Sequence, residues 1–121
     1  MILLPNCQCC GGCPCDAATI YFGNLANTVL TFHFTGGQSA DACKNEPGTL
    51  YVADASRCEY YADYDLNDRR EGCTVRVWFI VSGNECDCND SGQWCTYTIN
   101  GYSGGNCGLL YVTDSATECT V

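Results

Sequence analysis

The fold of this chain is decided by one stretch, Val75-Arg76-Val77-Trp78-Phe79-Ile80-Val81. Apolar side chains at positions 75, 77, 79 and 81 recur with the two-residue period of a β-strand and are predicted to face the core. Valine, isoleucine and the aromatic residues also favour strands. Because Trp78 and Ile80 are apolar as well, we expect the opposite face, which carries Arg76, to be covered by an N-terminal arm (residues 1–16) or by a partner. The stretch is therefore predicted to be the most buried strand of an all-β protein.

The rest of the chain has the same strand-like character on both sides of this stretch. Within Leu30–Thr35 the residues Leu30, Phe32 and Phe34 alternate with polar ones, and Gly, Asn, Asp and Ser separate this segment from others rich in Thr, Tyr and Val. The predicted strands are Ala18–Phe22, Thr28–Thr35, Thr49–Ala53, Cys58–Tyr64, Thr74–Ser82, Trp94–Asn100, Leu109–Thr113 and Thr117–Val121. Short strands at this spacing favour a sandwich or a small barrel. We expect a disulfide-rich β-sandwich, Ig-like or jelly-roll-like, over residues 17–121.

Composition excludes several classes of protein. The chain has 121 residues, enough for one domain, with 14 acidic and 5 basic residues and a formal net charge of −9. Such a surface should repel nucleic acid and anionic membranes, since a nucleic-acid binder needs a basic face. No apolar run approaches the ~20 residues of a membrane span. We therefore expect no nucleic-acid partner and no membrane partner.

Thirteen cysteines dominate the chemistry of the chain. Residues 1–16 form an irregular N-terminal arm, which carries Cys7, Cys9, Cys10, Cys13 and Cys15. The others, mostly at predicted strand ends, are Cys43, Cys58, Cys73, Cys86, Cys88, Cys95, Cys107 and Cys119. This density predicts a disulfide scaffold, and the odd total means that the cysteines cannot all pair within one chain. We expect at least two arm cysteines to be bonded to cysteines of residues 43–119, and one further bond to join neighbouring subunits.

Metal binding is the alternative interpretation of two motifs. Cys10 and Cys13 form a Cys-x2-Cys fragment, and with Cys7 and Cys15 they could hold zinc or an iron–sulfur cluster. Asp63, Asp65 and Asn67 begin like a calcium-binding loop, but the glycine and the glutamate that such a loop needs further on are missing. Disulfides and polar turns explain both motifs more simply, so we expect no cofactor.

Catalysis finds little support in the sequence. The single histidine, His33, lies between two phenylalanines in a predicted strand, with no nucleophile motif around it. Carboxylate pairs such as Asp63 and Asp65 are expected by chance among 14 acidic residues. We therefore predict that the protein is not an enzyme.

The opening Cys-Cys-Gly-Gly-Cys-Pro (residues 9–14), followed by Tyr/Thr-rich strands that end in cysteine, resembles small cysteine-rich β-proteins of tailed bacteriophages. The resemblance implies a virion component, a capsid decoration protein or a tail or fibre accessory, whose partners are other virion proteins or copies of itself. Residues 1–5 lack the pattern of a secretory signal, so we expect oxidation after release by lysis rather than after secretion. Virion or extracellular localisation follows from this interpretation.

Two other functions remain open. The first is a secreted adhesin or carbohydrate-binding module, in which Trp78, Trp94 and Tyr102 would be platforms for a surface glycan. The second is a metal-binding or redox protein that uses the cysteine cluster.

Overall fold

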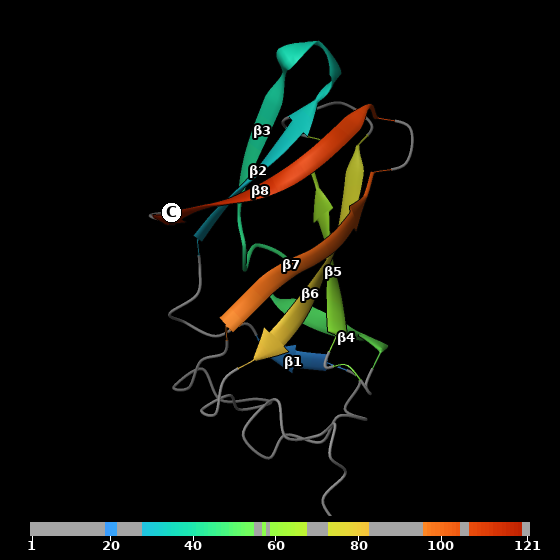
Figure 1. The fold of residues 1–121 in the computed structure, drawn as a ribbon, viewed down its shortest axis with the longest axis vertical. Coiled ribbons are helices and arrows are strands. Elements are labelled where there is room, and N and C mark those ends of the chain that lie inside the picture. Colours follow the sequence, from blue (N-terminus) through green and yellow to red (C-terminus); the bar gives the residue numbers. More distant parts are fainter. Residues whose placement is uncertain are drawn as a thin grey trace, which may run out of the picture.

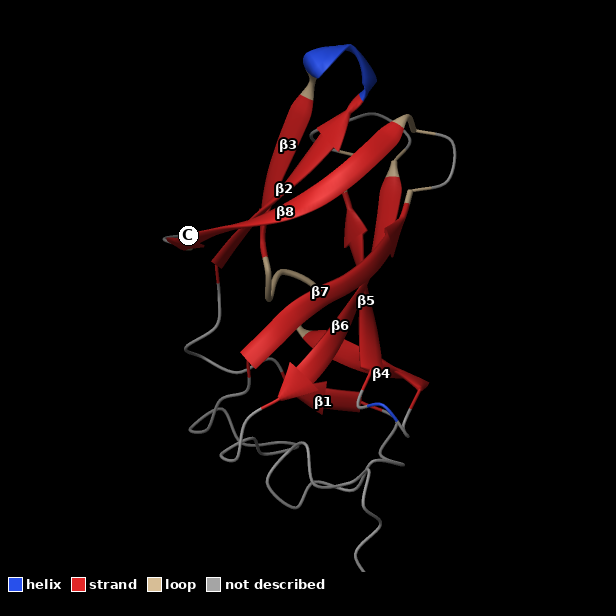
Figure 2. Cartoon of the chain, in the orientation of Figure 1, coloured by secondary structure: helices blue, strands red, loops and turns tan. Residues whose placement is uncertain are grey.

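The computed structural model describes residues 19–21, 28–54, 57, 59–67, 73–82, 96–104 and 107–119 (Figure 1). These residues form eight strands and a short 3-10 helix, η2 (Thr35–Gly37). The strands are β1 (Thr19–Tyr21), β2 (Thr28–Phe34), β3 (Ser39–Cys43), β4 (Thr49–Asp54), β5 (Glu59–Asp65), β6 (Thr74–Ser82), β7 (Thr96–Ser103) and β8 (Leu109–Glu118). All strand pairs are antiparallel, so the prediction of a disulfide-containing all-β fold is confirmed (Figure 2).

The larger sheet has five strands in the order β1-β4-β5-β6-β7. Strand β6, which contains residues 75–81, lies between β5 and β7 and has the bounds that the sequence predicted. Val75, Val77 and Phe79 are fully buried, whereas Arg76 on the other face is exposed and Trp78 is half-buried. The inner face thus follows the prediction, and the expected cover of the outer face by the N-terminal arm lies outside the described residues.

The smaller sheet has three strands in the order β3-β2-β8 and lies in the upper part of Figure 1. Strands β2 and β3 form a hairpin through η2, where Gly36 and Gly37 both take φ of 79°, a conformation that glycine adopts without strain. The other neighbour of β2 is β8, which comes from the far end of the chain. Near Ala116 the register of this pair shifts, because β8 carries extra residues opposite the start of β2.

One hydrophobic core joins the two sheets. It combines Leu30, Phe32 and Phe34 of β2 with alternate residues of β5 and β6, and the rings of Phe32 and Tyr64 lie 5.5 Å apart between the sheets. Burial of each such large side chain contributes about 1.5–3 kcal/mol. The two-residue period read from the sequence therefore places the core correctly on both sides of the sandwich.

Polar bonds also cross between the sheets, at a lysine next to β3. Lys44 is only 4% exposed. Its ammonium nitrogen lies 2.6 Å from Asp114 Oδ2 in β8 and donates to the carbonyl of Tyr97 in β7 at 3.1 Å. In return, the hydroxyl of Tyr64 in β5 donates to the carbonyl oxygen of Lys44 at 2.5 Å. Lys44 therefore connects strands of both sheets with hydrogen bonds that are shielded from water.

Two disulfides close the described part of the chain. Cys43 bonds to Cys119 and joins the end of β3 to the end of β8, with Cα atoms 5.6 Å apart. Cys73 bonds to Cys107 next to β6 and β8, with Cα atoms 5.3 Å apart. These four cysteines are therefore not available to the arm. The predicted bonds of the remaining ones lie outside the described residues, namely those of Cys7, Cys9, Cys10, Cys13, Cys15, Cys58, Cys86, Cys88 and Cys95.

Three strands differ from the prediction by more than one residue at an end. Strand β3 was not predicted, because Ser39-Ala40-Asp41-Ala42-Cys43 has low strand propensity and forms only through pairing with β2 and burial of its two alanines. A separate strand from Thr117 is wrong, since β8 continues through the irregular region to Glu118. Strand β7 begins at Thr96 and continues past Gly101 to Ser103.

In the described part of the chain, no helix has the length and apolar character that a membrane crossing requires.

Candidate functional site

A row of aromatic side chains crosses the outer face of the five-stranded sheet. The register places Tyr51 of β4 opposite Tyr61 of β5, Tyr61 opposite Trp78 of β6, and Trp78 opposite Gly101 of β7. Neighbouring strands lie about 4.8 Å apart, so the row spans roughly 10 Å from Tyr51 to Trp78. We call Tyr51, Tyr61 and Trp78 the aromatic row. Gly101 ends it without a side chain, which leaves the edge of the Trp78 indole uncovered on that side.

A polar row lies beside the aromatic row, two residues away from it on each strand. Asp63 is opposite Arg76, and Arg76 is opposite Ser103. Arg76 donates to both carboxylate oxygens of Asp63, from Nε at 2.8 Å and from Nη2 at 3.1 Å. Its guanidinium also lies 4.0 Å above the centre of the Tyr61 ring. Arg76 is therefore held in one orientation by a planar carboxylate and an aromatic face, which limits the side-chain entropy lost when a ligand binds.

The two rows meet in a shallow depression with a volume of about 340 Å³, lined by Asp63, Thr74, Arg76, Trp78 and Ser103. Its walls combine one aromatic edge with a guanidinium, a carboxylate and two hydroxyls. Hydrogen-bond donors and acceptors thus predominate around a single apolar surface, so a ligand that fits this depression would itself be rich in polar groups.

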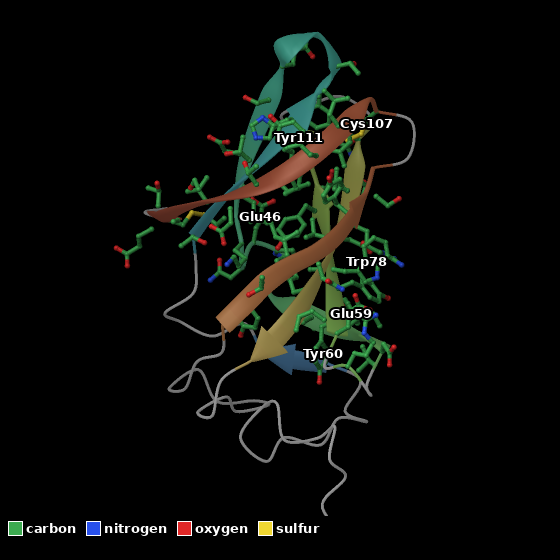
Figure 3. The ribbon with its side chains drawn as sticks, in the orientation of Figure 1. Glu46, Glu59, Tyr60, Trp78, Cys107 and Tyr111 are labelled. Carbon is green, nitrogen blue, oxygen red and sulfur yellow. A yellow bond between two sulfur atoms is a disulfide. The ribbon has the colours of Figure 1, made fainter. Side chains whose placement is uncertain are left out.

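A second polar pair flanks the aromatic row on the opposite side. Asn100 of β7 reaches across β6 and donates from Nδ2 to Oε2 of Glu59 in β5 at 2.5 Å. Arg57 lies 3.9 Å from the other oxygen of Glu59. Glu59 and Trp78 are labelled in Figure 3, which shows them beside the same sheet. Planar polar groups therefore border the aromatic row on both of its long sides.

The charges of this face are balanced within it. The hydrogen bond to Asp63 raises the pKa of Arg76 above its ordinary value, and the guanidinium of an arginine is charged at every accessible pH. The paired carboxylate of Asp63 compensates this charge locally, and Glu59 is paired with Arg57 at 3.9 Å. The face therefore suits an uncharged ligand better than an anionic one.

The sequence identified only part of this face. Trp78 belongs to it, but Tyr102 is opposite the inward-facing Val77 and lies on the other face of the sheet. Trp94 lies outside the described residues. Sequence reasoning missed Tyr51 and Tyr61, although each alternates along its strand with residues that face the core.

The other sequence candidates in the described ranges take part in polar and ring contacts with neighbouring residues. Both oxygens of Asp63 accept from Arg76, and Asp65 accepts from the backbone N–H of Asn67 at 3.0 Å, as in an ordinary polar turn. His33 contacts Thr113 through Nε2 at 2.9 Å and stacks on Tyr111 at 4.2 Å. Among the described residues, no three Cys, His, Asp or Glu side chains gather closely enough to hold a metal ion. The arm cysteines proposed as zinc or iron–sulfur ligands are not among these residues.

No protein family, curated protein or solved structure matches this chain. The interpretation of the site therefore depends on its own geometry.

Proposed function

We propose that this protein is a non-enzymatic binding module that recognises a neutral carbohydrate on the outer face of its five-stranded sheet. The observation that carries the proposal is the aromatic row of Tyr51, Tyr61 and Trp78, set in register across three strands and bordered by planar polar pairs. Of the functions that the sequence left open, carbohydrate binding is the one that this arrangement favours.

The chemistry of a sugar ring matches this face. A hexose presents C–H groups on its flat faces and hydroxyls around its rim. The C–H face would lie on Trp78 and Tyr51, while Arg76 and Asp63 would exchange hydrogen bonds with neighbouring hydroxyls. Tyr51 and Trp78 lie two strand spacings apart, roughly 10 Å, and the guanidinium of Arg76 covers the Tyr61 ring between them, so the two outer rings would contact separate sugar units. The net charge of −9 disfavours acidic polysaccharides, nucleic acid and anionic lipid.

Direct binding tests this proposal. The oxidised protein would be screened against neutral and anionic glycans, and the best ligand would be measured by calorimetry. Loss of a stacking tryptophan typically costs about 2 kcal/mol or more, so Trp78→Ala should weaken binding at least tenfold. Tyr111→Ala is the control, because Tyr111 is an exposed aromatic side chain on the other sheet. Failure of every neutral glycan to bind, or equal affinities for the Trp78→Ala variant and the natural protein, would contradict the proposal.

A virion accessory is the second candidate, and the two disulfides are compatible with it, as they are with a secreted module. They link strands that are far apart in the sequence, and such bonds persist in an oxidising environment outside the cell. A glycan-binding module on a phage tail or capsid would combine both roles. Phage particles purified on a density gradient should then contain the protein at a fixed ratio to the capsid protein. Its absence from the particles would leave a secreted module.

A further inference from the structure

Lys44 and Asp114 form an unusually close and shielded pair. The ammonium nitrogen of Lys44 lies 2.6 Å from Asp114 Oδ2, and the side chain of Lys44 is 5% exposed while that of Asp114 is 31% exposed. Burial of a lysine ammonium is costly, so such residues are rare unless they are paired. The two groups belong to distant parts of the chain, one next to β3 and the other within β8.

The two oxygens of the Asp114 carboxyl group have different surroundings. Oδ1 accepts hydrogen bonds from the hydroxyl of Thr28 at 2.7 Å and from the backbone N–H of Ala116 at 3.0 Å. Oδ2 faces the Lys44 nitrogen. Ala116 has a φ of 61°, which is uncommon for a residue other than glycine. Such backbone conformations are concentrated at active sites and ligand-binding sites. One oxygen is thus held by two donors, and the other is next to an amine.

We propose that Lys44 and Asp114 condense spontaneously into an intramolecular isopeptide bond. A proton passes from the Lys44 ammonium to Oδ2, which gives a neutral amine and a carboxylic acid. The amine nitrogen then attacks Cγ of Asp114. The bond between Nζ and Cγ forms, the bond between Cγ and Oδ2 breaks, and Oδ2 leaves as water with its own hydrogen and one from the amine. The step needs no oxidant, reductant or further reactant.

The surroundings of the pair assist each part of this step. Fixed proximity of an amine and a carboxyl group lowers the barrier, because no entropy is lost to bring them together. The Thr28 hydroxyl and the Ala116 N–H stabilise negative charge on Oδ1 as the tetrahedral intermediate forms. In the product, the remaining N–H of the amide can still donate to the carbonyl of Tyr97, which accepts from Lys44 in the starting state at 3.1 Å.

The ion pair is the starting state, and it sets the pace of the reaction. Burial alone would raise the pKa of Asp114, but its hydrogen bonds with Lys44, Ala116 and Thr28 outweigh this and lower the pKa. The neutral pair is therefore the minor form, and we expect condensation to follow folding slowly. The product would link the turn after β3 to β8 near the Cys43–Cys119 disulfide, and reductants would not break it.

Mass spectrometry of the unmodified sequence tests this inference without any variant. After reduction, alkylation and denaturation, aged protein should be lighter, by the mass of one water molecule, than the mass calculated for the fully alkylated sequence. A protease digest should then contain a branched peptide that joins Lys44 to Asp114. The full sequence mass would overturn the proposal, and so would a water loss confined to a linear peptide, which indicates a succinimide at Asp114.

Variants separate the roles of the contributing groups. Lys44→Arg keeps the positive charge but offers no attacking amine, so it should retain the full mass. Thr28→Val removes one donor to Oδ1 and should slow the mass loss several-fold while the fold is retained, as checked by circular dichroism. If Lys44→Arg still loses water, or if Thr28→Val condenses at the rate of the natural protein, the assigned roles are wrong.

Discussion

The hydroxyl of Tyr64 offers the sharpest test of how the two sheets are held together. Tyr64 is fully buried, and its hydroxyl donates to the carbonyl oxygen of Lys44 across the sheets. Tyr64→Phe deletes this oxygen atom and keeps the ring that packs on Phe32. The substitution leaves no large cavity, so the expected loss is that of one buried hydrogen bond. Removal of a donor from a buried acceptor costs about 1–3 kcal/mol of the free energy of unfolding.

Urea denaturation of the oxidised protein, followed by tyrosine and tryptophan fluorescence, measures this loss. The midpoint should fall while the slope stays constant, which shows that only the stability has changed. Tyr61→Phe is the matched control, because Tyr61 lies on the same strand but faces outward, and it should change stability by less than about 0.5 kcal/mol. If Tyr64→Phe is as mild as Tyr61→Phe, the hydroxyl does not hold the sheets together.

Alkaline pH should reduce the contribution of the Tyr64 hydroxyl to the free energy of unfolding. Burial, with smaller contributions from the charges of Glu46 and Asp114, raises the pKa of Tyr64 well above its ordinary value of 10.0. Because the folded pKa exceeds the unfolded one, the contribution of the neutral hydroxyl is fully present below pH 10 and is lost as the pH rises further. The stability advantage of the natural protein over Tyr64→Phe should therefore be constant up to about pH 10 and shrink above it. An advantage that grows at high pH would contradict this assignment.

Two further predictions concern the disulfides and the candidate site. Full reduction should lower the denaturation midpoint strongly, because each native disulfide of a small domain contributes about 2–5 kcal/mol, and an unchanged midpoint would mean that the core alone stabilises the fold. Gly101→Leu should abolish glycan binding without unfolding the protein. A Cβ at this position would lie 3.8 Å from Cε3 of Trp78, which is an ordinary contact, and the longer leucine side chain would cover the indole. Calorimetry measures the binding and circular dichroism checks the fold, and undiminished binding would place the ligand elsewhere.

The fold was largely predictable because it depends on alternation along single strands. Val75, Val77 and Phe79 signal their burial through a local pattern that needs no knowledge of their partners. Strand β3 carries no such signal, because its alanines become a core face only when β2 pairs with them. The continuity of β8 was hidden for a related reason: Asp114 and Ser115 are typical turn residues, and here their side chains accept hydrogen bonds from the backbone N–H groups of Ala116 and Thr117 inside a strand.

The candidate site was less predictable because it depends on register between strands. Trp78 is conspicuous in the sequence, but nothing local to it indicates that Tyr51 and Tyr61 lie in the same row. The positions of Arg76 and Asp63 could be derived only after β5 and β6 had been aligned. Lys44 is the extreme case, because a lysine in a polar turn is normally exposed, and its burial results from elements on both sides of the core.

The pairing of β2 with β8 has a consequence for biogenesis. Thr31 pairs with Thr113, and Cys43 bonds across a separation of 76 residues, so the small sheet is completed only by the last strand that the structure describes. Strands β4 to β7 are hydrogen-bonded between sequence neighbours and can assemble as the chain leaves the ribosome. The hairpin of β2 and β3 must wait for β8, with one edge of β2 unpaired meanwhile. A chain truncated before residue 109 would keep that edge of β2 open, and such a chain would be prone to aggregate in the cell that produces it.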